Sequence, residues 1–344
     1  MSLFEHPEFD HHEEVVFCHD EESGLKAIIA VHDTTLGPSL GGTRLWNYSS
    51  SAEALTDVLR LSRGMTYKSA MAGLPLGGGK AVIIGDAKSI KSDALFRAYG
   101  RFINSLGGKY ITAEDVNIRT SDIDIVAQET RHVAGTADKA GDPSPHTALG
   151  TYLGLKAAAK HRLGSEDLNG VKIAVQGLGA VGYAFAKYCR DDGAELIVTD
   201  INEETLERAK SELDATVVGL DEIYGVDADI YAPCALGATI NDETLKQLKC
   251  KIIAGSANNQ LENPKHDKVV KDMGILYAPD YVINAGGVIH VCSEAADMSL
   301  EETDKRVRDI YNTLDKLFAR AKEEDRPTGE LADQMAREII ANAK

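Results

Sequence analysis

The chain has 344 residues, 43% of them hydrophobic and 26% charged, a balance typical of a globular protein with two domains. No apolar run is long enough to span a membrane, and the polar, acidic N-terminus is unlike a secretory signal. The formal net charge of −17 argues against nucleic acid as the main partner, because most of such a surface repels phosphates.

Neither the cysteines nor the histidines indicate a metal site. The five cysteines are scattered and form no Cys-x-x-Cys pair, which favours free thiols in a reducing compartment and predicts a cytoplasmic protein. His6, His11 and His12 cluster near the N-terminus, and we interpret them as solvated side chains. We therefore expect no bound metal. The cysteines occupy positions 18, 189, 234, 250 and 292.

The first part of the chain predicts a pair of strands followed by a helix. Apolar residues at 15–17 and 25–31 are separated by a polar turn sequence. A glycine-rich segment at 36–44 predicts a loop. Apolar residues at helical spacing then predict a helix that begins near Ser51 and carries Lys68 near its end.

A second lysine follows three consecutive glycines. Lys80 leads directly into a predicted strand at 81–84. An amphipathic helix is expected over 92–106, and a short strand at 110–112 delivers Asp115 at its carboxyl end. The first domain therefore carries two lysines and a carboxylate at the ends of regular elements.

A small, polar, proline-bearing segment at 135–145 predicts the end of the first domain. Beyond it, strands alternate with helices, which indicates a doubly wound parallel sheet in an α/β protein. We expect a substrate and oligomerisation domain at 1–135, a Rossmann domain at 136–325, and a C-terminal helix at 326–344 that packs on the first domain. The strands of the second domain are expected at 171–175, 196–199, 216–218, 230–232, 252–254 and 275–277, and the closing helices at 300–323 and 328–343.

The pattern Gly-x-Gly-x-x-Gly stands between a predicted strand and a predicted helix. Gly177 permits a tight turn, Gly179 lets the backbone approach a pyrophosphate, and Gly182 lets helix and strand pack closely. Asp200 follows the next strand, where a carboxylate accepts hydrogen bonds from ribose hydroxyls and repels a 2′-phosphate; it also suits a helix cap. The sequence therefore predicts NAD, rather than NADP, as the cofactor. The cofactor-binding segment comprises Gly177, Leu178, Gly179, Ala180, Val181 and Gly182.

Two lysines in one cleft lower each other's pKa, and burial adds to the effect. One of Lys68 and Lys80 would then hold a substrate carboxylate while the other acts as a general base, and Asp115 would pass protons. The residues alone leave an alternative open, in which Lys80 binds a phosphate and Lys68 is a solvated residue at a helix end.

The segment 73–86, which contains Leu-Pro-Leu-Gly-Gly-Gly-Lys, resembles the signature of the glutamate/leucine/phenylalanine/valine dehydrogenase superfamily. The resemblance covers nearly the whole chain, and the leucine dehydrogenases are the most similar members. It implies a two-domain enzyme that deaminates an amino acid oxidatively with NAD. Further matching segments lie at 32–38, 63–68, 110–115 (Tyr-Ile-Thr-Ala-Glu-Asp), 231–238 and 277–287 (Tyr-Ala-Pro-Asp-Tyr-Val-Ile-Asn-Ala-Gly-Gly).

The resemblance also implies a role for each matching residue. Lys68 would bind the α-carboxylate of the substrate, with the backbone of Gly41 and Gly42 nearby. Lys80 would activate the water that adds to an imino intermediate, and Asp115 would pass protons. The remaining implied residues are Met65 on the substrate side, Asn259 near both substrate and nicotinamide, and Thr147, Cys234, Ala235 and Asn284 on the cofactor side.

Four apolar residues stand where the resemblance implies the pocket for the substrate side chain. A buried, unpaired carboxylate there would cost several kcal/mol, so we expect glutamate to be refused and leucine, valine or isoleucine to be accepted. The alternatives are a phenylalanine or other bulky apolar substrate, or a non-catalytic sensor that binds NAD. Taken singly, each of the four also suits ordinary core. They are Leu40, Ala113, Val288 and Val291.

The resemblance finally implies a homo-oligomer, with a dimer favoured and an octamer possible. The expected partners are otherwise only small molecules: the amino acid, its 2-oxo acid and ammonia. Some residues depart from the family pattern, among them His146 beside Thr147 and His290 beyond the second glycine pair. These departures bear on the identity of the substrate more than on the chemistry.

Overall fold

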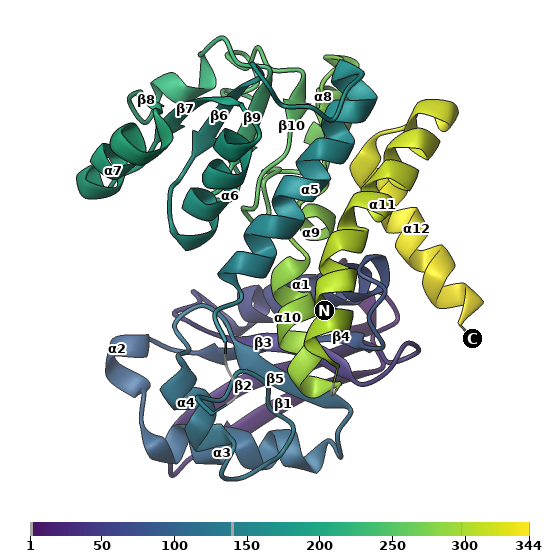
Figure 1. The fold of residues 1–344 in the computed structure, drawn as a ribbon. Helices are drawn as coiled ribbons and strands as arrows, with labels where there is room; N and C mark the ends of the chain where they lie inside the picture. Colours follow the sequence, from purple (N-terminus) through teal and green to yellow (C-terminus); the bar gives the residue numbers. More distant parts are fainter. Residues whose placement is uncertain (1–2, 139–140, 297, 344) are drawn as a thin grey trace. The chain divides into compact units, whose positions relative to one another are not determined.

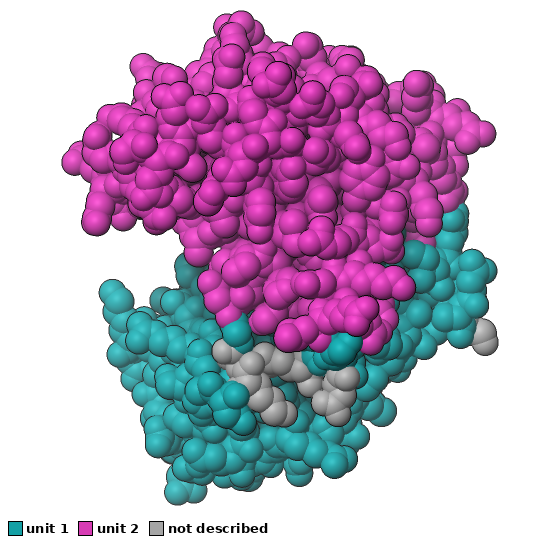
Figure 2. Space-filling view, in the orientation of Figure 1, with its two compact units in different colours: residues 1–141, 291–299, 336–344 teal, residues 142–290, 300–335 magenta. Residues whose placement is uncertain are grey.

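The computed structural model describes residues 3–138, 141–296 and 298–343 (Figure 1). The chain forms two compact units, coloured separately in Figure 2. The α/β fold predicted from the sequence, with two domains and a parallel sheet in the second, is confirmed. Unit 1 comprises Met1–Gly141, Val291–Ser299 and Ala336–Lys344, and unit 2 comprises Asp142–His290 and Leu300–Met335.

Unit 1 is built on a five-stranded mixed sheet with the order β1-β2-β4-β3-β5. Strand β2 pairs antiparallel with both β1 and β4, whereas β3 pairs parallel with both β4 and β5. Strand β3 is therefore an inner strand of the parallel part. The strands are β1 (Glu14–Asp20), β2 (Leu25–Asp33), β3 (Ser39–Trp46), β4 (Gly77–Ile84) and β5 (Tyr110–Glu114).

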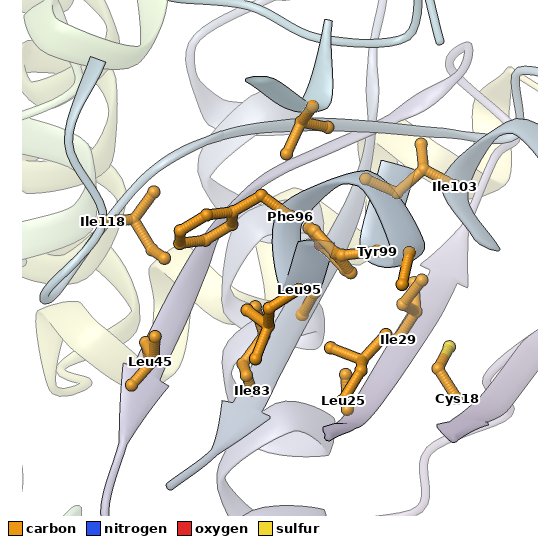
Figure 3. Close-up of a cluster of buried hydrophobic side chains, with 14 of the residues drawn as sticks. Cys18, Leu25, Ile29, Leu45, Ile83, Leu95, Phe96, Tyr99, Ile103 and Ile118 are labelled. Carbon is orange, nitrogen blue, oxygen red and sulfur yellow. The ribbon is translucent and has the colours of Figure 1, made fainter. Parts of the chain in front are cut away.

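Helices cover both faces of this sheet. Helix α1 (Ser51–Met71) packs its Val58 and Leu59 against Ile28 and Val82 of the sheet. Residues of the opposite face form a second apolar cluster with α3 (Asp93–Ser105), shown in Figure 3. The hydroxyl groups of Ser50 and Ser92 accept backbone N–H groups and cap these two helices, within one residue of the predicted starts. The shorter helices are η1 (Leu3–Glu5), α2 (Ala87–Ile90) and α4 (Thr120–Val126).

The glycine-rich segment 36–44 corrects the sequence prediction, because it forms most of strand β3 and not a loop. Strand β4 likewise begins at Gly77, four residues before the predicted start. Glycine is uncommon inside strands, which is why the composition favoured a loop. At Gly41 and Gly42 of β3, backbone atoms of the adjacent strands β4 and β5 leave no room for a side chain.

The interpretation of the N-terminal histidines as solvated is wrong for His12, which is buried. Its Nε2 lies 3.0 Å from both the carbonyl oxygen of Leu59 and the hydroxyl of Ser62, and its Nδ1 accepts the N–H of Asp10. The ring also packs edge-to-face against buried His32, with ring centres 4.7 Å apart. A sequence pattern could not reveal these partners on α1, about 50 residues away in the chain.

Unit 2 contains a six-stranded sheet in which every strand pair is parallel, in the order β11-β10-β9-β6-β7-β8. Strand β6, which leads into the Gly-x-Gly-x-x-Gly segment, is central and forms the point where the strand order reverses. Such a point is where doubly wound sheets bind ligands. The strands are β6 (Lys172–Gln176), β7 (Glu195–Thr199), β8 (Thr216–Val217), β9 (Ile230–Pro233), β10 (Ile252–Ile253) and β11 (Leu276–Tyr277).

One long helix of unit 2, α5 (Ser144–Leu163), is not among the predicted elements. Small residues occur on several of its sides, so the pattern lacks an amphipathic period. Gly150 and Gly154 allow close packing, because an added Cβ would lie 2.6 Å from Ile310 and from Leu314. The other helices that lie wholly or partly in unit 2 are α6 (Ala180–Asp191), α7 (Glu203–Leu213), η2 (Glu222–Tyr224), α8 (Lys265–Asp272), α9 (Asp280–Ile283), α10 (Gly286–Ala295), α11 (Leu300–Glu324) and α12 (Thr328–Asn342).

The boundaries of the units differ slightly from the predicted domain ends. Unit 1 extends to Gly141, because Ala134 donates to Thr112 of β5 and Ala137 donates to Asp124. Helix α12 is divided: its first turn is tied to unit 2 through Thr328, whose hydroxyl donates to the Tyr277 carbonyl, and residues from Ala336 onward belong to unit 1. Among the described residues, no helix is long and apolar enough to cross a membrane.

Candidate active site

Lys80 and Asp115 form an ion pair although strand β3 separates the strands that carry them. Lys80 lies on β4, and Asp115 directly follows β5. The Nζ atom of Lys80 donates to Oδ2 of Asp115. The Lys80 side chain is only 8% exposed and that of Asp115 is 25% exposed. The structure thus brings together the two residues to which the sequence prediction gave the proton transfers.

The glycines of β3 make this contact across the strand possible. A Cβ atom on Gly41 would lie 1.7 Å from the carbonyl oxygen of Gly79, next to Lys80. A Cβ atom on Gly42 would lie 2.1 Å from the carbonyl oxygen of Glu114 and 3.0 Å from Cβ of Asp115. Neither position accepts a methyl group without displacement of backbone. The two glycines therefore set the approach of the strands that carry the pair.

Two apolar residues lie near the pair on the same face of the sheet. Thr43 pairs with Ala81 and Gly42 with Ala113, so Gly42 is flanked by Lys80 and Ala113. Because alternate residues of a strand share a face, Leu40 also lies on this face. Leu40 and Ala113 are both buried. Two of the four residues predicted to line the apolar pocket thus share one surface of unit 1 with the predicted proton-transfer pair.

Helix α1 covers this face and carries two further predicted residues. An added Cβ on Gly78 would lie 2.0 Å from the backbone nitrogen of Thr66, so helix and strand are in direct contact. Met65 and Lys68 stand on either side of Thr66 in the chain, and both are half-buried. The helix that carries Lys68 therefore contacts β4 at Gly78, two residues before Lys80.

Burial and charge shift the pKa values of the pair in a definite direction. Burial lowers the pKa of Lys80 below its ordinary value, and the Asp115 carboxylate only partly opposes this effect. Burial acts to raise the pKa of Asp115, but the cations of Lys80 and Arg44 outweigh it and hold that pKa below its ordinary value. The site thus favours a lysine that gives up its proton more readily than usual and a carboxylate that stays ionised.

Arg44 is a site residue that the sequence prediction missed. Its Nη1 lies 2.9 Å from Oδ2 of Asp57, and its Nε lies 3.5 Å from Oδ2 of Asp115. The signal that could have found it is its position in the strand, two residues beyond Gly42 and so on the same face. Its partners on α1 and after β5 are distant in the sequence and give no local pattern.

The glycine turn of unit 2 fits a dinucleotide. Gly177 has φ +96°, and an added Cβ would lie 2.5 Å from Cβ of Ala235; at Gly182 it would lie 2.1 Å from the Gly177 carbonyl oxygen. At Gly179, the N-cap of α6, an added Cβ would meet nothing within 4 Å, so the space beside the helix start is open. A diphosphate in that space would face the N–H groups and positive dipole end of α6. Leu178, Ala180 and Val181 complete this segment.

Asp200 closes the turn from the next strand. Its Oδ2 accepts the backbone N–H of Leu178 at 2.5 Å, and its Oδ1 accepts that of Asn202 at 2.8 Å. Gly177 also donates to the carbonyl oxygen of Thr199. The carboxylate is thus held beside the turn, where it can accept the ribose hydroxyls of NAD. The suggested helix cap is instead provided by Asn202, whose side chain accepts the N–H of Thr205.

The remaining predicted cofactor residues lie in unit 2 and differ in how firmly they are held. The Asn284 amide donates to Asn258 at 2.7 Å and to the carbonyl of Ser256. Asn259 is exposed and has φ +51°. Thr147 donates to the Pro143 carbonyl. The backbone N–H of Cys234 donates to Gln176, at the end of β6, and Ala235, the next residue, is exposed and contacts Gly177 as described above.

The predicted site residues are therefore divided between the units. Unit 1 contains those to which chemistry and the amino acid were assigned, and unit 2 contains those of the cofactor together with Val288. The residues in unit 1 are Leu40, Gly41, Gly42, Met65, Lys68, Lys80, Ala113, Asp115 and Val291. The residues in unit 2 are Thr147, Gly177–Gly182, Asp200, Cys234, Ala235, Asn259, Asn284 and Val288.

Two models of one family of known proteins match this chain. The family described as "Glu/Leu/Phe/Val dehydrogenase, dimerisation domain" matches residues 12–132, and "Glutamate/Leucine/Phenylalanine/Valine dehydrogenase" matches residues 196–344. The chain belongs to this family. The resemblance inferred from the sequence is thus confirmed, as is the expectation of an amino-acid dehydrogenase that uses NAD.

Individual members are similar over almost the full length. The leucine dehydrogenase of Geobacillus stearothermophilus is 56% identical over 343 residues, which are 99% of this chain and 94% of the relative. The L-tryptophan dehydrogenase of Nostoc punctiforme is 50% identical over 345 residues, 100% of this chain and 98% of the relative. A crystal structure of L-tryptophan dehydrogenase from Nostoc punctiforme superposes with a TM-score of 0.88 at 48% identity and covers 97% of each chain.

Proposed function

We propose that this protein catalyses the reversible, NAD-dependent oxidative deamination of leucine and other branched-chain L-amino acids to the 2-oxo acid and ammonia. The observation that carries the proposal is the composition of one sheet face in unit 1. It presents the Lys80–Asp115 pair beside buried, apolar Leu40 and Ala113. A leucine side chain gains about 1.5–3 kcal/mol on burial in apolar surroundings, whereas a glutamate carboxylate would lack a partner there.

The proposal assigns the amino acid to unit 1 and the cofactor to unit 2. Lys68 on α1 holds the α-carboxylate, with the backbone of Gly41 and Gly42 beside it. Met65, Val288, Val291 and Asn259 complete the set to which substrate contacts are assigned. Gly177–Gly182 and Asp200 hold NAD, which when bound accepts the hydride that leaves Cα. Thr147, Cys234, Ala235, Asn259 and Asn284 are assigned to its nicotinamide side.

The residues of this chain then move the protons. The ammonium group of the substrate first loses a proton to solvent, and loss of the hydride from Cα then leaves an iminium carbon, to which a water molecule adds. Lys80, whose pKa is lowered, takes a proton from that water as the C–O bond forms. The proton passes through Asp115 and Lys80 to the amino nitrogen, the C–N bond breaks, and ammonia leaves. A second proton leaves the hydroxyl group as the carbonyl of the 2-oxo acid forms.

A bulky apolar amino acid is the second candidate substrate, because an L-tryptophan dehydrogenase is 50% identical over the whole chain. A panel of leucine, valine, isoleucine, phenylalanine, tryptophan and glutamate, with NADH formation followed by absorbance, separates the candidates. We expect kcat/KM to be highest for leucine and glutamate activity to be undetectable. A preference for tryptophan or phenylalanine would favour the second candidate, and a preference for glutamate would contradict the apolar character of Leu40 and Ala113.

The proposal includes a cytoplasmic homo-oligomer, with a dimer favoured over an octamer. None of the five cysteines forms a disulfide with another described residue, as expected of a reducing compartment. Strand β1 lies at an edge of the first sheet and exposes 60% of Phe17, which suits pairing with a second copy. Light scattering behind a sizing column measures the mass. A mass of one chain at micromolar concentration would contradict the proposal.

A further inference from the structure

The ion pair of Lys80 and Asp115 does not stand alone, because a second cation reaches the same carboxylate oxygen. Oδ2 of Asp115 accepts from Nζ of Lys80 and lies 3.5 Å from Nε of Arg44. The Nε atom of Arg44 is buried and makes no hydrogen bond to any described residue. An N–H group in such a position is costly unless it gains a partner. The nearest acceptor in the ion-pair geometry is Asp115.

Arg44 is held in this position from its other end. Its Nη1 lies 2.9 Å from Oδ2 of Asp57 on α1, and the hydroxyl of Tyr48 donates to the same oxygen at 2.6 Å. The Asp57 side chain is only 12% exposed. The carboxylates of Asp115 and Asp57 raise the pKa of Arg44, although its burial opposes them, so the guanidinium stays charged. Arg44 is thus a fixed cation between two carboxylates.

The charges around Asp115 come from three elements. Lys80 lies on β4 and Arg44 on β3. Asp57 on α1 pairs with Nη1 of Arg44, whereas Nε of Arg44 faces Asp115. When Lys80 transfers its proton or turns toward a water molecule, Asp115 would lose its strongest partner. A partly buried carboxylate without a cation is destabilised and becomes protonated. Arg44 is placed to favour the ionised form, so that Asp115 releases a proton that passes through it and does not retain it.

We propose that Arg44 is a positioning residue that holds Asp115 in place and favours its ionised form while Lys80 exchanges its proton. The inference rests on the proposed function, since it takes Lys80 and Asp115 as the proton-transfer pair. Arg44 does not contact the substrate in this scheme. It acts through Asp115, and its fixed charge also disfavours the protonated form of Lys80.

The structure offers a matched control and a route for chemical rescue. Arg60 also pairs with Asp57, at 3.3 Å, but 57% of its side chain is exposed. Arg44 and Arg60 both line a solvent-open cavity of about 550 Å³ together with Trp46 and Tyr48. Removal of the Arg44 side chain would extend this cavity toward Asp115. A guanidinium ion from solution could then occupy the vacated position.

The test compares Arg44→Ala, Arg44→Lys and Arg60→Ala in the full-length enzyme, with kcat followed against pH. Without Arg44, the pKa of Lys80 should rise, so the acid limb of the profile should move to higher pH by about one unit, and kcat at neutral pH should fall about tenfold. Arg44→Lys should keep the midpoint near that of the wild type with a lower kcat. Arg60→Ala should stay within about twofold of wild type, since surface pairs contribute little.

Guanidinium chloride at millimolar, non-denaturing concentration should restore part of the activity of Arg44→Ala and none in Lys80→Ala. An unchanged pH profile in Arg44→Ala, or a loss of activity that neither guanidinium nor Arg44→Lys reverses, would overturn the inference. Should Arg44→Ala fail to fold, Arg44→Gln takes its place, because it removes the charge but keeps most of the side chain and should show the same shift of the acid limb. Normal kcat in Lys80→Ala would instead refute the proposed function itself.

Discussion

The backbone N–H of Leu178 donates to the Asp200 carboxylate at 2.5 Å, so the residue to which we assign the choice of cofactor also holds the glycine turn in place. A change at position 200 therefore alters two properties at once: the negative charge beside the ribose and the shape of the turn. The two effects separate if the substituted side chain keeps an oxygen that can accept the Leu178 N–H.

Asp200→Asn should narrow the preference for NAD over NADP with little loss of NAD affinity, because the amide oxygen replaces the turn contact while the charge is removed. Asp200→Ala should lose both the negative charge and the turn contact, so NAD binding should weaken by about tenfold, or about 1.4 kcal/mol. Titration calorimetry with both cofactors measures this. Asp214→Asn, an exposed carboxylate paired with Arg190, is the charge-matched control. Equal losses in the Asn and Ala variants would contradict the dual role.

Lys80→Ala should lower kcat by roughly 10² to 10⁴, because the base that activates water is lost. NAD affinity should remain nearly unchanged, since the glycine turn lies in the other unit. Stopped-flow kinetics and equilibrium binding of NADH measure the two quantities. Lys91→Ala is the control, because Lys91 forms a similar ion pair with Asp122 in the same unit but away from the site. If Lys80 bound a phosphate instead, NAD affinity would fall while kcat at saturation survived.

Lys68→Ala should mainly raise KM, whereas Lys80→Ala should mainly lower kcat. If Lys68 holds the α-carboxylate, its loss should raise KM for leucine strongly, by about 10-fold or more, since a charge-assisted contact contributes about 1.5–3 kcal/mol. Amines without a carboxylate should then lose their disadvantage relative to leucine. Steady-state kinetics with leucine and isopentylamine test this. An unchanged ratio between the two substrates would remove Lys68 from carboxylate recognition.

Gly42→Ala should abolish most activity, because the added Cβ would lie 2.1 Å from the backbone oxygen of Glu114 and push Asp115 away from Lys80. Gly64→Ala is the matched change on α1, where an added Cβ meets nothing within 4 Å. That variant should keep full activity and gain about 0.5–1 kcal/mol of stability from helix propensity. Enzyme activity and thermal unfolding, measured for both variants, test these two expectations. Wild-type activity in Gly42→Ala would show that the strands can separate without consequence.

The buried histidines predict a loss of stability in mild acid. Burial lowers the pKa of His32 to about 4, so the unfolded chain, with a pKa near 6.5, takes up its proton first. The contribution of neutral His32 is therefore complete above about pH 6.5 and is lost as the pH falls toward 4, by roughly 3 kcal/mol. Urea unfolding at a series of pH values should show this slope. His32→Asn should flatten it, whereas the exposed control His19→Asn should leave it unchanged.

The second sheet was predictable because its signals are local. The Gly-x-Gly-x-x-Gly turn, the alternation of strands with helices, and Asp200 at a strand end each lie within a few residues of the element they define. Strand β3 was not predictable, because glycines that permit close strand approach have the same composition as a loop. The environment of His12 and the bridge through Arg44 depend on partners brought together only by the fold.

Neither unit is made from one continuous piece of chain. The strands of the first sheet all precede residue 115, whereas Val291–Ser299 and Ala336–Lys344, which also belong to unit 1, follow most of unit 2 in the sequence. During synthesis, unit 1 therefore receives its last residues only after every residue of unit 2 has been made. A fragment that ends at Gly141 would lack both of these later segments, so it would not contain the whole of the unit to which we assign the amino acid.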